Sequence, residues 1–396
     1  MNSEKLWTKE FIAVSTINFL ATLMFYLLMV TIATYAKNEF HVSTSTAGLV
    51  SSIFIIGSLL GRLGAGRYIS EIGTKKVFWT GLILLTVASI FYFGIFNTTT
   101  LLLNRLFHGI AFGLMGTAAG TIIAQVLPSE RRGEGIGYYS LSTILATAIG
   151  PFFGILLMKL DNGFMIMYLI NVIFSIGSMI FLALVKIKIA ETSKEKRIVE
   201  KGPILTRFIE PKAAPISLVA LVIGFSYSGV MSFLSFYAEE IHLVTAASYF
   251  FLVYAVVIIF TRPITGKLMD TRGANIIVYP CFAIFAVGMF LFSEASAGWM
   301  LLLASAFIGL GYGNFNSIAQ AIAIKVTEPH RFGLATSTYF ILYDLGLGLG
   351  PYILGFIEPY SGYRAIFFSM VIVILLCYPM YYFAYGKKTR NLQYNN

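Results

Sequence analysis

The chain has 396 residues, of which 58% are hydrophobic, 15% aromatic and only 12% charged, and its net charge is +10. An average soluble domain carries about 25% charged residues. These values exclude a disordered chain, a nucleic-acid-binding domain and an ordinary cytosolic enzyme, and they indicate a membrane protein with many spans.

Twelve apolar segments are long enough to cross a bilayer as helices, which takes about 20 residues each. We expect these spans at 11–36, 45–66, 77–96, 100–126, 134–158, 164–186, 215–238, 246–268, 275–293, 299–325, 333–356 and 363–386. Lipid offers the backbone no hydrogen-bond partners, and the short alternating strands of a barrel are not seen. The expected fold is therefore an all-α membrane protein with twelve transmembrane helices.

The positive charges are distributed unevenly between the two sides of the membrane. Of the 28 Lys and Arg residues, 24 lie in segments on the side of the N-terminus, three lie on the other side, and Arg105 lies within a span. Because Lys and Arg concentrate in cytoplasmic loops, we expect both termini in the cytoplasm. The composition and the single-chain design indicate a multi-pass protein of a bacterial plasma membrane.

The sequence aligns with itself after a shift of 200 residues, which indicates an internal repeat. The matched pairs include Arg62 and Arg262, Gly66 and Gly266, Gly73 and Gly273, Arg131 and Arg331, Gly150 and Gly350, and Pro151 and Pro351. Chance alignment of two apolar segments would match aliphatic residues instead. We therefore expect an N-terminal six-helix bundle (1–186), a basic cytoplasmic linker (187–213) and a C-terminal six-helix bundle (214–396).

The loop after the second span reads GRLGAGRYISEIGTKKV, and the loop after the eighth reads RPITGKLMDTRGANIIV. The second copy resembles the G-x-L-x-D-x-x-G signature of the major facilitator superfamily, at Gly266, Leu268, Asp270 and Gly273. The first copy has Ser70 at the position of the acid. The resemblance implies two pseudo-symmetric six-helix bundles that transport by alternating access.

The resemblance also implies a latch on the cytoplasmic side. An acid at a helix end pairs with neighbouring Arg residues and with the N-terminus of a facing helix, and it holds that side shut. The residues expected in this latch are Arg62, Gly66, Gly73, Arg262, Gly266, Asp270 and Gly273. The alternative for the two arginines is that their side chains only extend to the membrane interface.

The fourth span begins with LLLNRLFHGIAFG, which resembles a span-4 motif of the same superfamily through Arg105, His108, Gly109 and Gly113. An Arg within a span is costly and usually faces the bundle interior or a wet cavity. In the functional interpretation, Arg105 orients a polar network or a substrate anion and His108 titrates. The alternatives are an arginine that extends to the interface and a satisfied core histidine.

The fifth span resembles a motif of the drug:proton antiporter branch at Gly150, Pro151 and Gly154, and Gly350 and Pro351 repeat it in the eleventh span. Small residues allow close helix packing, and Pro adds a kink or pivot. We expect these five residues to act as helix pivots, and the resemblance favours export over import. The alternative is ordinary Gly and Pro helix packing.

Asp344 lies in the middle of the eleventh span and is the only carboxylate deep in any predicted span. A charge there must be protonated, paired or exposed to an aqueous cavity. We therefore expect Asp344, with His108 and Arg105, to couple transport to protons. The alternative is a structural role in which Asp344 bonds a polar group such as Asn314 or Asn316.

The resemblance implies that spans 1, 4, 7 and 10 line a central substrate cavity. The residues expected there are Asn18, Thr22, Tyr26, Phe112, Tyr227, Phe233, Tyr237, Tyr312, Asn314 and Asn316. Aromatic walls with few charges suit a lipophilic or amphipathic solute. For each aromatic residue the alternative is lipid contact or an interfacial belt.

These patterns predict a monomeric, proton-coupled secondary transporter that exports small lipophilic or amphipathic compounds. The alternative is a carrier, for export or import, of one metabolite such as a sugar, nucleoside, amino-acid derivative or metallophore. A membrane enzyme or receptor is disfavoured, because the sequence has no nucleotide-binding, hydrolase or metal motif. The expected partners are a small-molecule substrate, protons and the lipid bilayer, with no nucleic acid, cofactor or metal.

Overall fold

The computed structural model describes residues 5–29, 31–158, 160–185, 187 and 204–387. All regular secondary structure in these residues is helical, and 11 helical segments are long and apolar enough to cross a membrane. The last segment contains α14 (Phe332–Tyr381), a 50-residue helix broken by the non-helical backbone of Gly362. An unbroken helix of that length would be about 75 Å long, more than twice the hydrocarbon thickness. Its two arms are therefore separate spans, which confirms the predicted twelve.

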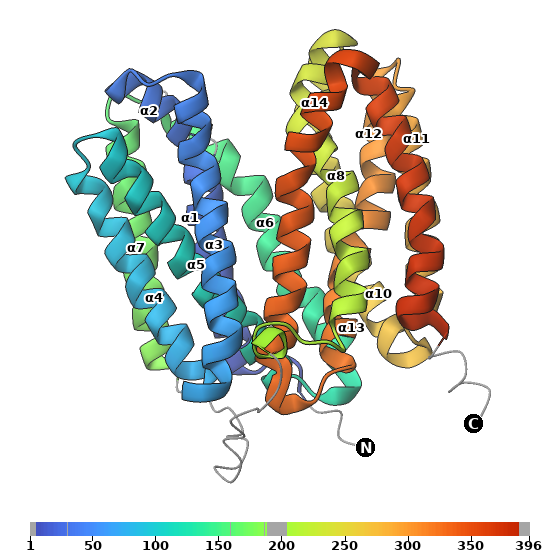
Figure 1. The fold of residues 1–396 in the computed structure, drawn as a ribbon, viewed down its shortest axis with the longest axis horizontal. Helices are drawn as coiled ribbons and strands as arrows, with labels where there is room; N and C mark the ends of the chain where they lie inside the picture. The colour runs from blue at the N-terminus through green and yellow to red at the C-terminus, as the bar shows by residue number, and fades with distance from the viewer. Residues whose placement is uncertain (1–4, 30, 159, 186, 188–203, 388–396) are drawn as a thin grey trace. The chain divides into compact units, whose positions relative to one another are not determined.

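The helices before the linker have the following bounds: α1 (Lys9–Met29), α2 (Ile32–Phe40), α3 (Thr44–Ile72), α4 (Thr74–Phe91), α5 (Thr98–Val126), α6 (Arg132–Met158) and α7 (Gly163–Leu184). Those after it are α8 (Ala214–Glu240), α9 (Val244–Ser248), α10 (Phe250–Arg272), α11 (Asn275–Ser293), α12 (Gly298–Ile308), α13 (Asn314–Lys325) and α14. A π-helical turn, η4 (Gly309–Gly313), joins α12 to α13. Figure 1 shows these elements as long, nearly parallel rods within each half.

The first predicted span, 11–36, is wrong at its C-terminal end, because α1 ends at Met29 and α2 begins at Ile32. The hydroxyl of Thr31 donates to the carbonyl oxygens of Leu27 (3.0 Å) and Leu28 (3.3 Å). A Thr side chain that bonds the preceding turn competes with the regular helix ladder. The regular helix therefore ends here, although the apolar character of the sequence continues.

The two motif loops are much shorter than predicted. α3 continues to Ile72 and α10 to Arg272, and each ends at one glycine with positive φ, 93° at Gly73 and 87° at Gly273. Residues other than Gly rarely adopt this backbone conformation. The two repeated glycines therefore make the sharp turns into α4 and α11.

The chain divides into two compact units. Unit 1 comprises Met1–Pro128, Ser142–Glu210 and Glu328–Thr338, and unit 2 comprises Ser129–Leu141, Pro211–Thr327 and Tyr339–Asn396. Each unit thus combines most of one half of the sequence with the beginning of one long helix, α6 or α14, from the other half. The predicted boundary in the linker stays a prediction, since residues 188–203 lie outside the described residues.

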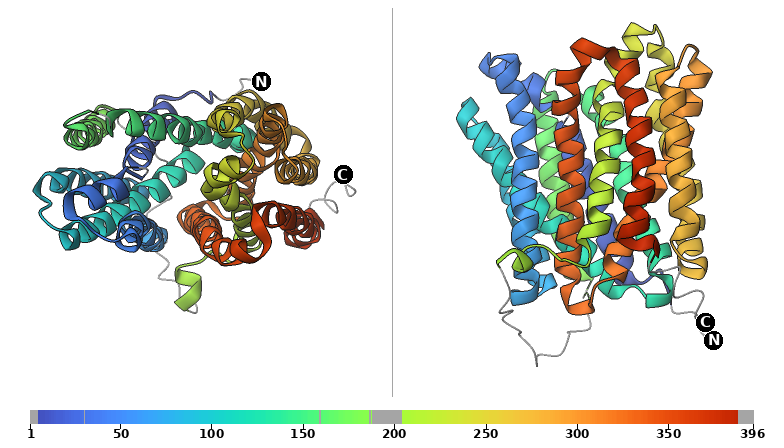
Figure 2. Two further views of the ribbon diagram at one scale, coloured as in Figure 1. Left: turned by 90° about the horizontal axis from the view of Figure 1, so that it is seen from above. Right: turned by 45° about the vertical axis from the view of Figure 1, so that its right-hand side comes forward.

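Close packing of α3 against α5 forms the centre of unit 1. A Cβ atom added to Gly109 or Gly113 of α5 would collide with the backbone carbonyl of Phe54 or Ser58 on α3. Backbones come this close where small residues recur along a helix face. In unit 2 the same kind of contact joins Gly346 of α14 to the backbone of α8. The left view of Figure 2 shows the helices from above, nearly end-on.

Candidate functional site

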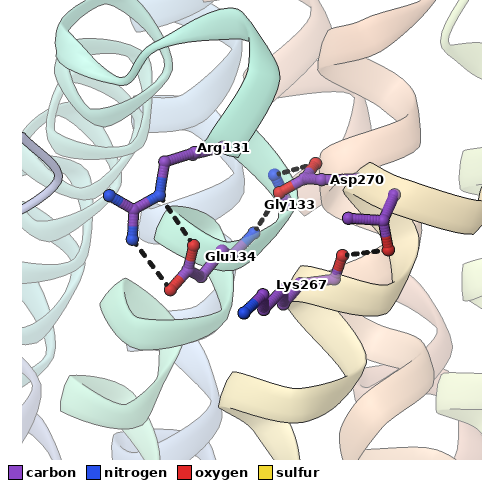
Figure 3. Close-up of polar contacts among 6 residues, drawn as sticks. Arg131, Gly133, Glu134, Lys267 and Asp270 are labelled. Carbon is purple, nitrogen blue, oxygen red and sulfur yellow. Dashed lines mark hydrogen bonds and ion pairs between the residues drawn. The ribbon is translucent and has the colours of Figure 1, made fainter. Parts of the chain in front are cut away.

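Asp270, near the C-terminal end of α10, caps the N-terminus of α6. Its Oδ1 accepts a hydrogen bond from the Gly133 N–H and its Oδ2 accepts one from the Glu134 N–H, both at 2.8 Å (Figure 3). The first N–H groups of a helix have no partner within the helix, and the helix dipole favours a negative charge there. The carboxylate thus joins residues from the two halves of the sequence within unit 2.

Arg131 and Glu134 complete this contact. The Arg131 Nε donates to Glu134 Oε2 at 2.9 Å and its Nη2 donates to Oε1 at 3.0 Å, a two-pronged pair (Figure 3). Gly133 lies where a Cβ would meet the Asp270 carboxylate, so a glycine is required for this close approach. The geometry suits the predicted latch, and the latch role itself stays a prediction.

The equivalent residues of the first motif lie in unit 1. Arg62 is buried and its carbonyl oxygen accepts a hydrogen bond from the Ser337 hydroxyl at 2.7 Å, while Gly66 packs against the Ser337 side chain. Ser70 is exposed, and its hydroxyl donates to the carbonyl oxygen of Arg67 in its own helix. Ser70 therefore does not repeat the contact of Asp270.

Arg262 is buried inside unit 2, with 2% of its surface exposed, and does not extend to the interface. Its Nη2 donates to the carbonyl oxygen of Gly313 at 2.7 Å, at the end of the η4 turn. Its Nε and Nη1 have no hydrogen-bond partner in the structure. π-helical turns are frequent at functional sites, and here the turn presents a carbonyl group to a buried cation.

A polar aromatic cluster includes Tyr312 of the η4 turn, directly before the Gly313 whose carbonyl oxygen Arg262 binds. The rings of Tyr227 and Tyr312 stack with centroids 3.9 Å apart, and the hydroxyls of Tyr312 and Tyr343 are in contact. The Asn316 amide donates to the Tyr343 hydroxyl at 3.0 Å, and the Tyr339 hydroxyl donates to the Asn316 carbonyl oxygen at 2.7 Å. The cluster thus connects α8, η4, α13 and α14 through side-chain hydroxyl and amide groups.

Asp344 directly follows Tyr343 in α14 and is half-buried. The Tyr343 hydroxyl belongs to the polar cluster, so Asp344 adjoins the cluster along the chain. Asn314 bonds the hydroxyls of Thr261 and Thr265, each at 3.0 Å, and therefore joins α13 to α10. Of the residues predicted for the cavity, Tyr227, Tyr312 and Asn316 belong to the same polar cluster that Asp344 adjoins.

Arg105 and His108 form a separate buried network in unit 1, so neither extends to the interface. Arg105 donates through Nε to the Val50 carbonyl oxygen (3.2 Å) and through Nη1 to the Tyr92 hydroxyl (3.4 Å), which lies 3.0 Å from His108 Nδ1. The guanidinium also lies 4.5 Å from the centroid of the Phe54 ring, a cation–π contact. The predicted trio is therefore divided between units, with Asp344 in unit 2.

The other predicted cavity residues have different environments. In unit 1, Asn18 donates to the hydroxyls of Ser142 and Thr143, at 2.8 and 3.2 Å, and Thr22 is buried. Phe112 stacks on Phe25 with centroids 5.5 Å apart. In unit 2, the rings of Phe233 and Tyr363 are 5.8 Å apart.

Tyr237, another residue expected in the cavity lining, packs in the interior of unit 2. Its side chain is fully buried and its hydroxyl donates to the carbonyl oxygens of Phe292 (3.1 Å) and Ser293 (3.0 Å). The hydroxyl satisfies backbone groups at the end of α11. Tyr237 therefore has a structural role in unit 2, and its place in a cavity wall stays a prediction.

The predicted pivots lie within helices at close contacts. Pro151 is inside α6 and Pro351 inside α14. Gly150 packs against Tyr26, and Gly350 packs against Ser228. Gly154 is buried one turn after Gly150. These contacts suit both the pivot role and ordinary helix packing.

Tyr339 and Tyr343 belong to the cluster, and the ring of Tyr254 stacks on that of Tyr227 with centroids 5.8 Å apart; the sequence did not lead us to expect these three tyrosines there. A signal was available, because Tyr339 and Tyr343 are four residues apart and share a helix face next to Asp344. Among the described residues, no group of three or more His, Cys, Asp or Glu side chains could hold a metal ion.

Comparison with known proteins identifies relatives along nearly the whole chain. A family model described as Major Facilitator Superfamily matches residues 14–301 and 244–393. An uncharacterised MFS-type transporter of Methanocaldococcus jannaschii is 23% identical over 381 residues, which are 93% of this chain and 96% of that protein. The staphylopine export protein of Staphylococcus aureus is 21% identical over 382 residues, 90% of this chain and 93% of that protein.

Another relative and two solved structures are similar to the chain. The multidrug resistance protein MdtG of Klebsiella pneumoniae is 29% identical over 161 residues, 39% of each chain. The human organic anion transporter MFSD10 has a TM-score of 0.80 at 15% identity, with 94% of this chain and 98% of that chain covered. The transporter FucP in its outward conformation has a TM-score of 0.75 at 17% identity, with the same coverage. At these identities the structures show a shared fold.

Proposed function

Because the chain belongs to the Major Facilitator Superfamily and is a transporter with many membrane spans, we propose that it exports small lipophilic or amphipathic organic compounds in exchange for protons, by alternating access. The observation that carries the proposal is the half-buried Asp344 beside the polar tyrosine cluster of unit 2. A carboxyl group in a dehydrated site is neutral, and it ionises in contact with water. Alternate wetting of Asp344 would therefore load and release a proton.

The cluster offers a path by which protonation of Asp344 would affect the neighbouring helices. Tyr343 precedes Asp344 in the helix, and its hydroxyl contacts both Tyr312 and the Asn316 amide. A hydroxyl can donate or accept, so we propose that a change in the charge of Asp344, on the same helix, redirects this chain of hydrogen bonds. The cluster crosses from α14 to η4 and α13, and it would couple the proton step to a movement of these helices.

The relatives support export as the direction. One relative is named as a multidrug resistance protein and another as a staphylopine export protein. The second candidate function, transport of one specific metabolite, is favoured by the near-complete coverage of the staphylopine exporter, 93% of that protein. The aromatic rings and scarce charges of the predicted cavity favour the broader class of compounds.

Asp344→Asn tests the proton role, since the amide keeps the shape of the side chain and cannot ionise. We expect the variant to fold and to lose efflux driven by a pH gradient in proteoliposomes, roughly 100-fold or more, as is typical when an essential proton-transfer group is removed. Glu358→Gln, which removes another carboxylate of α14, should leave efflux unchanged. Undiminished pH-driven efflux by Asp344→Asn would dismiss Asp344 as the proton carrier.

A ligand panel separates the two candidate functions. Thermal stabilisation of the purified protein would be measured with lipophilic cations, neutral amphiphiles, nucleosides, sugars and metallophores. Stabilisation by many unrelated amphiphiles supports broad export, whereas stabilisation by one metabolite alone supports the second function.

The orientation of the protein in the membrane, its oligomeric state and the membrane in which it lies are part of the proposal. The excess of Lys and Arg on one side supports cytoplasmic termini. We propose a monomer in a bacterial plasma membrane. Reporter fusions at the two termini, active only in the cytoplasm or only outside it, test the orientation.

A further inference from the structure

The two repeats of the motif differ at the position of the latch acid. In the second repeat, Asp270 caps α6 at Gly133 and Glu134, and Arg131 pairs with Glu134. The shift of 200 residues relates these positions to Ser70, Gly333, Leu334 and Arg331. The equivalent contact in unit 1 therefore lacks both acids: Ser70 replaces the capping Asp, and Leu334 replaces the Glu that pairs with the arginine.

The missing negative charge is supplied by Glu210, at the end of the segment that joins the two halves. Its carboxylate forms an ion pair with Arg331, at the turn that leads into α14. The backbone N–H of Glu210 donates to the Thr338 hydroxyl at 2.8 Å. Only 3% of the Glu210 side chain is exposed, although acidic residues are almost never fully buried unless paired.

The preceding residues of the linker hold Glu210 in place. Arg331 also donates through Nη2 to the carbonyl oxygen of Thr206 at 3.2 Å. The guanidinium of Arg67 on α3 lies 5.6 Å from the centroid of the Phe208 ring. One side of the linker end thus contacts the beginning of α14, and the other contacts the end of α3.

The same stretch of α14 contacts the first motif directly. The Ser337 hydroxyl donates to the Arg62 carbonyl oxygen at 2.7 Å, and a Cβ added to Gly333 would meet the Ile69 side chain. Ile69 directly precedes Ser70. The N-terminus of α14 therefore lies at the position where an acid at residue 70 could cap it, by analogy with Asp270 and α6.

We propose that Glu210 is the acid of the first latch, so that the linker itself holds the beginning of α14 against α3. This deepens the proposed function, because alternating access requires such contacts to release in each cycle. In the second repeat the latch acid is part of the motif. In the first it lies on the segment between the halves, so displacement of residues 206–210 and release of the latch are a single event.

The test uses labelling of a cysteine introduced in place of Ser337, which is fully buried in the latch. The purified full-length Ser337→Cys protein is treated with a soluble maleimide, and labelling of each cysteine is followed by mass spectrometry. The natural Cys281 and Cys377 are buried within the other unit and report unfolding. Labelling requires no transport, so failure of this proposal is distinguishable from failure of the proposed function.

We expect Glu210→Gln to accelerate labelling of the introduced cysteine roughly tenfold, because a neutral amide replaces one partner of a charge-assisted hydrogen bond. Arg331→Gln should have the same effect. Ser70→Asp, which restores the acid of the motif, should slow labelling again in the Glu210→Gln background. The matched control is Glu71→Gln, which removes an exposed carboxylate paired with Arg67 and should leave the rate unchanged.

Equal labelling rates in Glu210→Gln and the parent would overturn the proposal. Faster labelling of all three cysteines in both Glu210→Gln and Arg331→Gln would also overturn it. That result would mean that the ion pair stabilises the whole fold and not one local contact. Faster labelling confined to the introduced cysteine, with reversal by Ser70→Asp, is the result that establishes the latch.

Discussion

Two arginines are buried in the units without a matching acid. In the part of the chain that the structure describes, no ion pair involves the guanidinium of Arg105 or Arg262. The Arg105 Nη2 and the Arg262 Nε and Nη1 also have no hydrogen-bond partner in the structure. A buried charge costs several kcal/mol unless it is compensated. A residue kept at such a cost is a candidate for function.

Arg262→Gln tests this interpretation for unit 2. The variant removes the buried charge and keeps a polar side chain that can donate and accept hydrogen bonds. We expect the midpoint of thermal unfolding to stay the same or rise, and pH-driven transport to fall at least about tenfold, which corresponds to about 1.4 kcal/mol. Lys267→Gln, on the exposed side of the same helix, is the control. A lower unfolding midpoint with normal transport would make Arg262 a structural residue.

At the scale of elements, glycines set the distance between α3 and α5. Gly57 and Gly61 of α3 and Gly109 and Gly113 of α5 each lie where a Cβ would collide with the backbone of the facing helix. Helices in lipid associate through close packing, because lipid offers no hydrophobic driving force. Gly109 and Gly113, which resemble part of a family motif in sequence, thus have a packing role in the structure.

Gly109→Ala is expected to destabilise the protein by about 1–3 kcal/mol, the usual cost of overpacking a core. The new methyl group would overlap the Phe54 carbonyl oxygen, and α3 would have to move away. The measurement is the thermal unfolding midpoint, with Gly177→Ala of α7 as the control, because nothing lies within 4 Å of the added Cβ there. Equal midpoints for the two variants would argue against the close contact.

At the scale of the whole molecule, the division into units repeats the internal symmetry of the sequence. Ser129–Leu141 joins unit 2 and Glu328–Thr338 joins unit 1. The two exchanged segments are related by the shift of about 200 residues. Each unit contains an acid at the beginning of one of these long helices, with Asp270 at α6 in one unit and Glu210 at Arg331, next to α14, in the other. Under the proposal, these are two latches that differ in the origin of the acid.

Asp270→Asn should weaken the unit 2 latch. The amide accepts fewer hydrogen bonds and carries no charge, at a cost of about 1–2 kcal/mol, or roughly a 5- to 30-fold change in population. The N–H groups of Gly133 and Glu134 depend on this carboxylate, so their hydrogen exchange should accelerate by that factor. Glu130→Gln, an exposed acid next to the same helix, is the control. Unchanged exchange in the peptide that contains Gly133 would show that Asp270 does not hold the helix end.

The candidate site was only partly predictable from the sequence. Asp270 could be predicted as a latch residue because its motif is a local, repeated sequence pattern. The structure adds the identity of the helix that it caps, which is α6. Arg105 and Asp344 could both be predicted as candidate site residues, because charged residues are rare in apolar segments. Their spacing in the sequence does not determine whether they lie in one proton-coupling site. They lie in different units, and each has its own aromatic neighbours.

The amino-acid sequence by itself determined the helical class, the number of spans and the repeat, because apolar length and repeated Gly, Pro and Arg positions are local properties of the chain. Tertiary structure alone decided which polar groups meet. Asn316 with Tyr339 and Tyr343, and Glu210 with Arg331, join residues that no sequence pattern relates. Such contacts depend on how whole helices pack, since only packing determines which groups lose their water and must find partners within the protein.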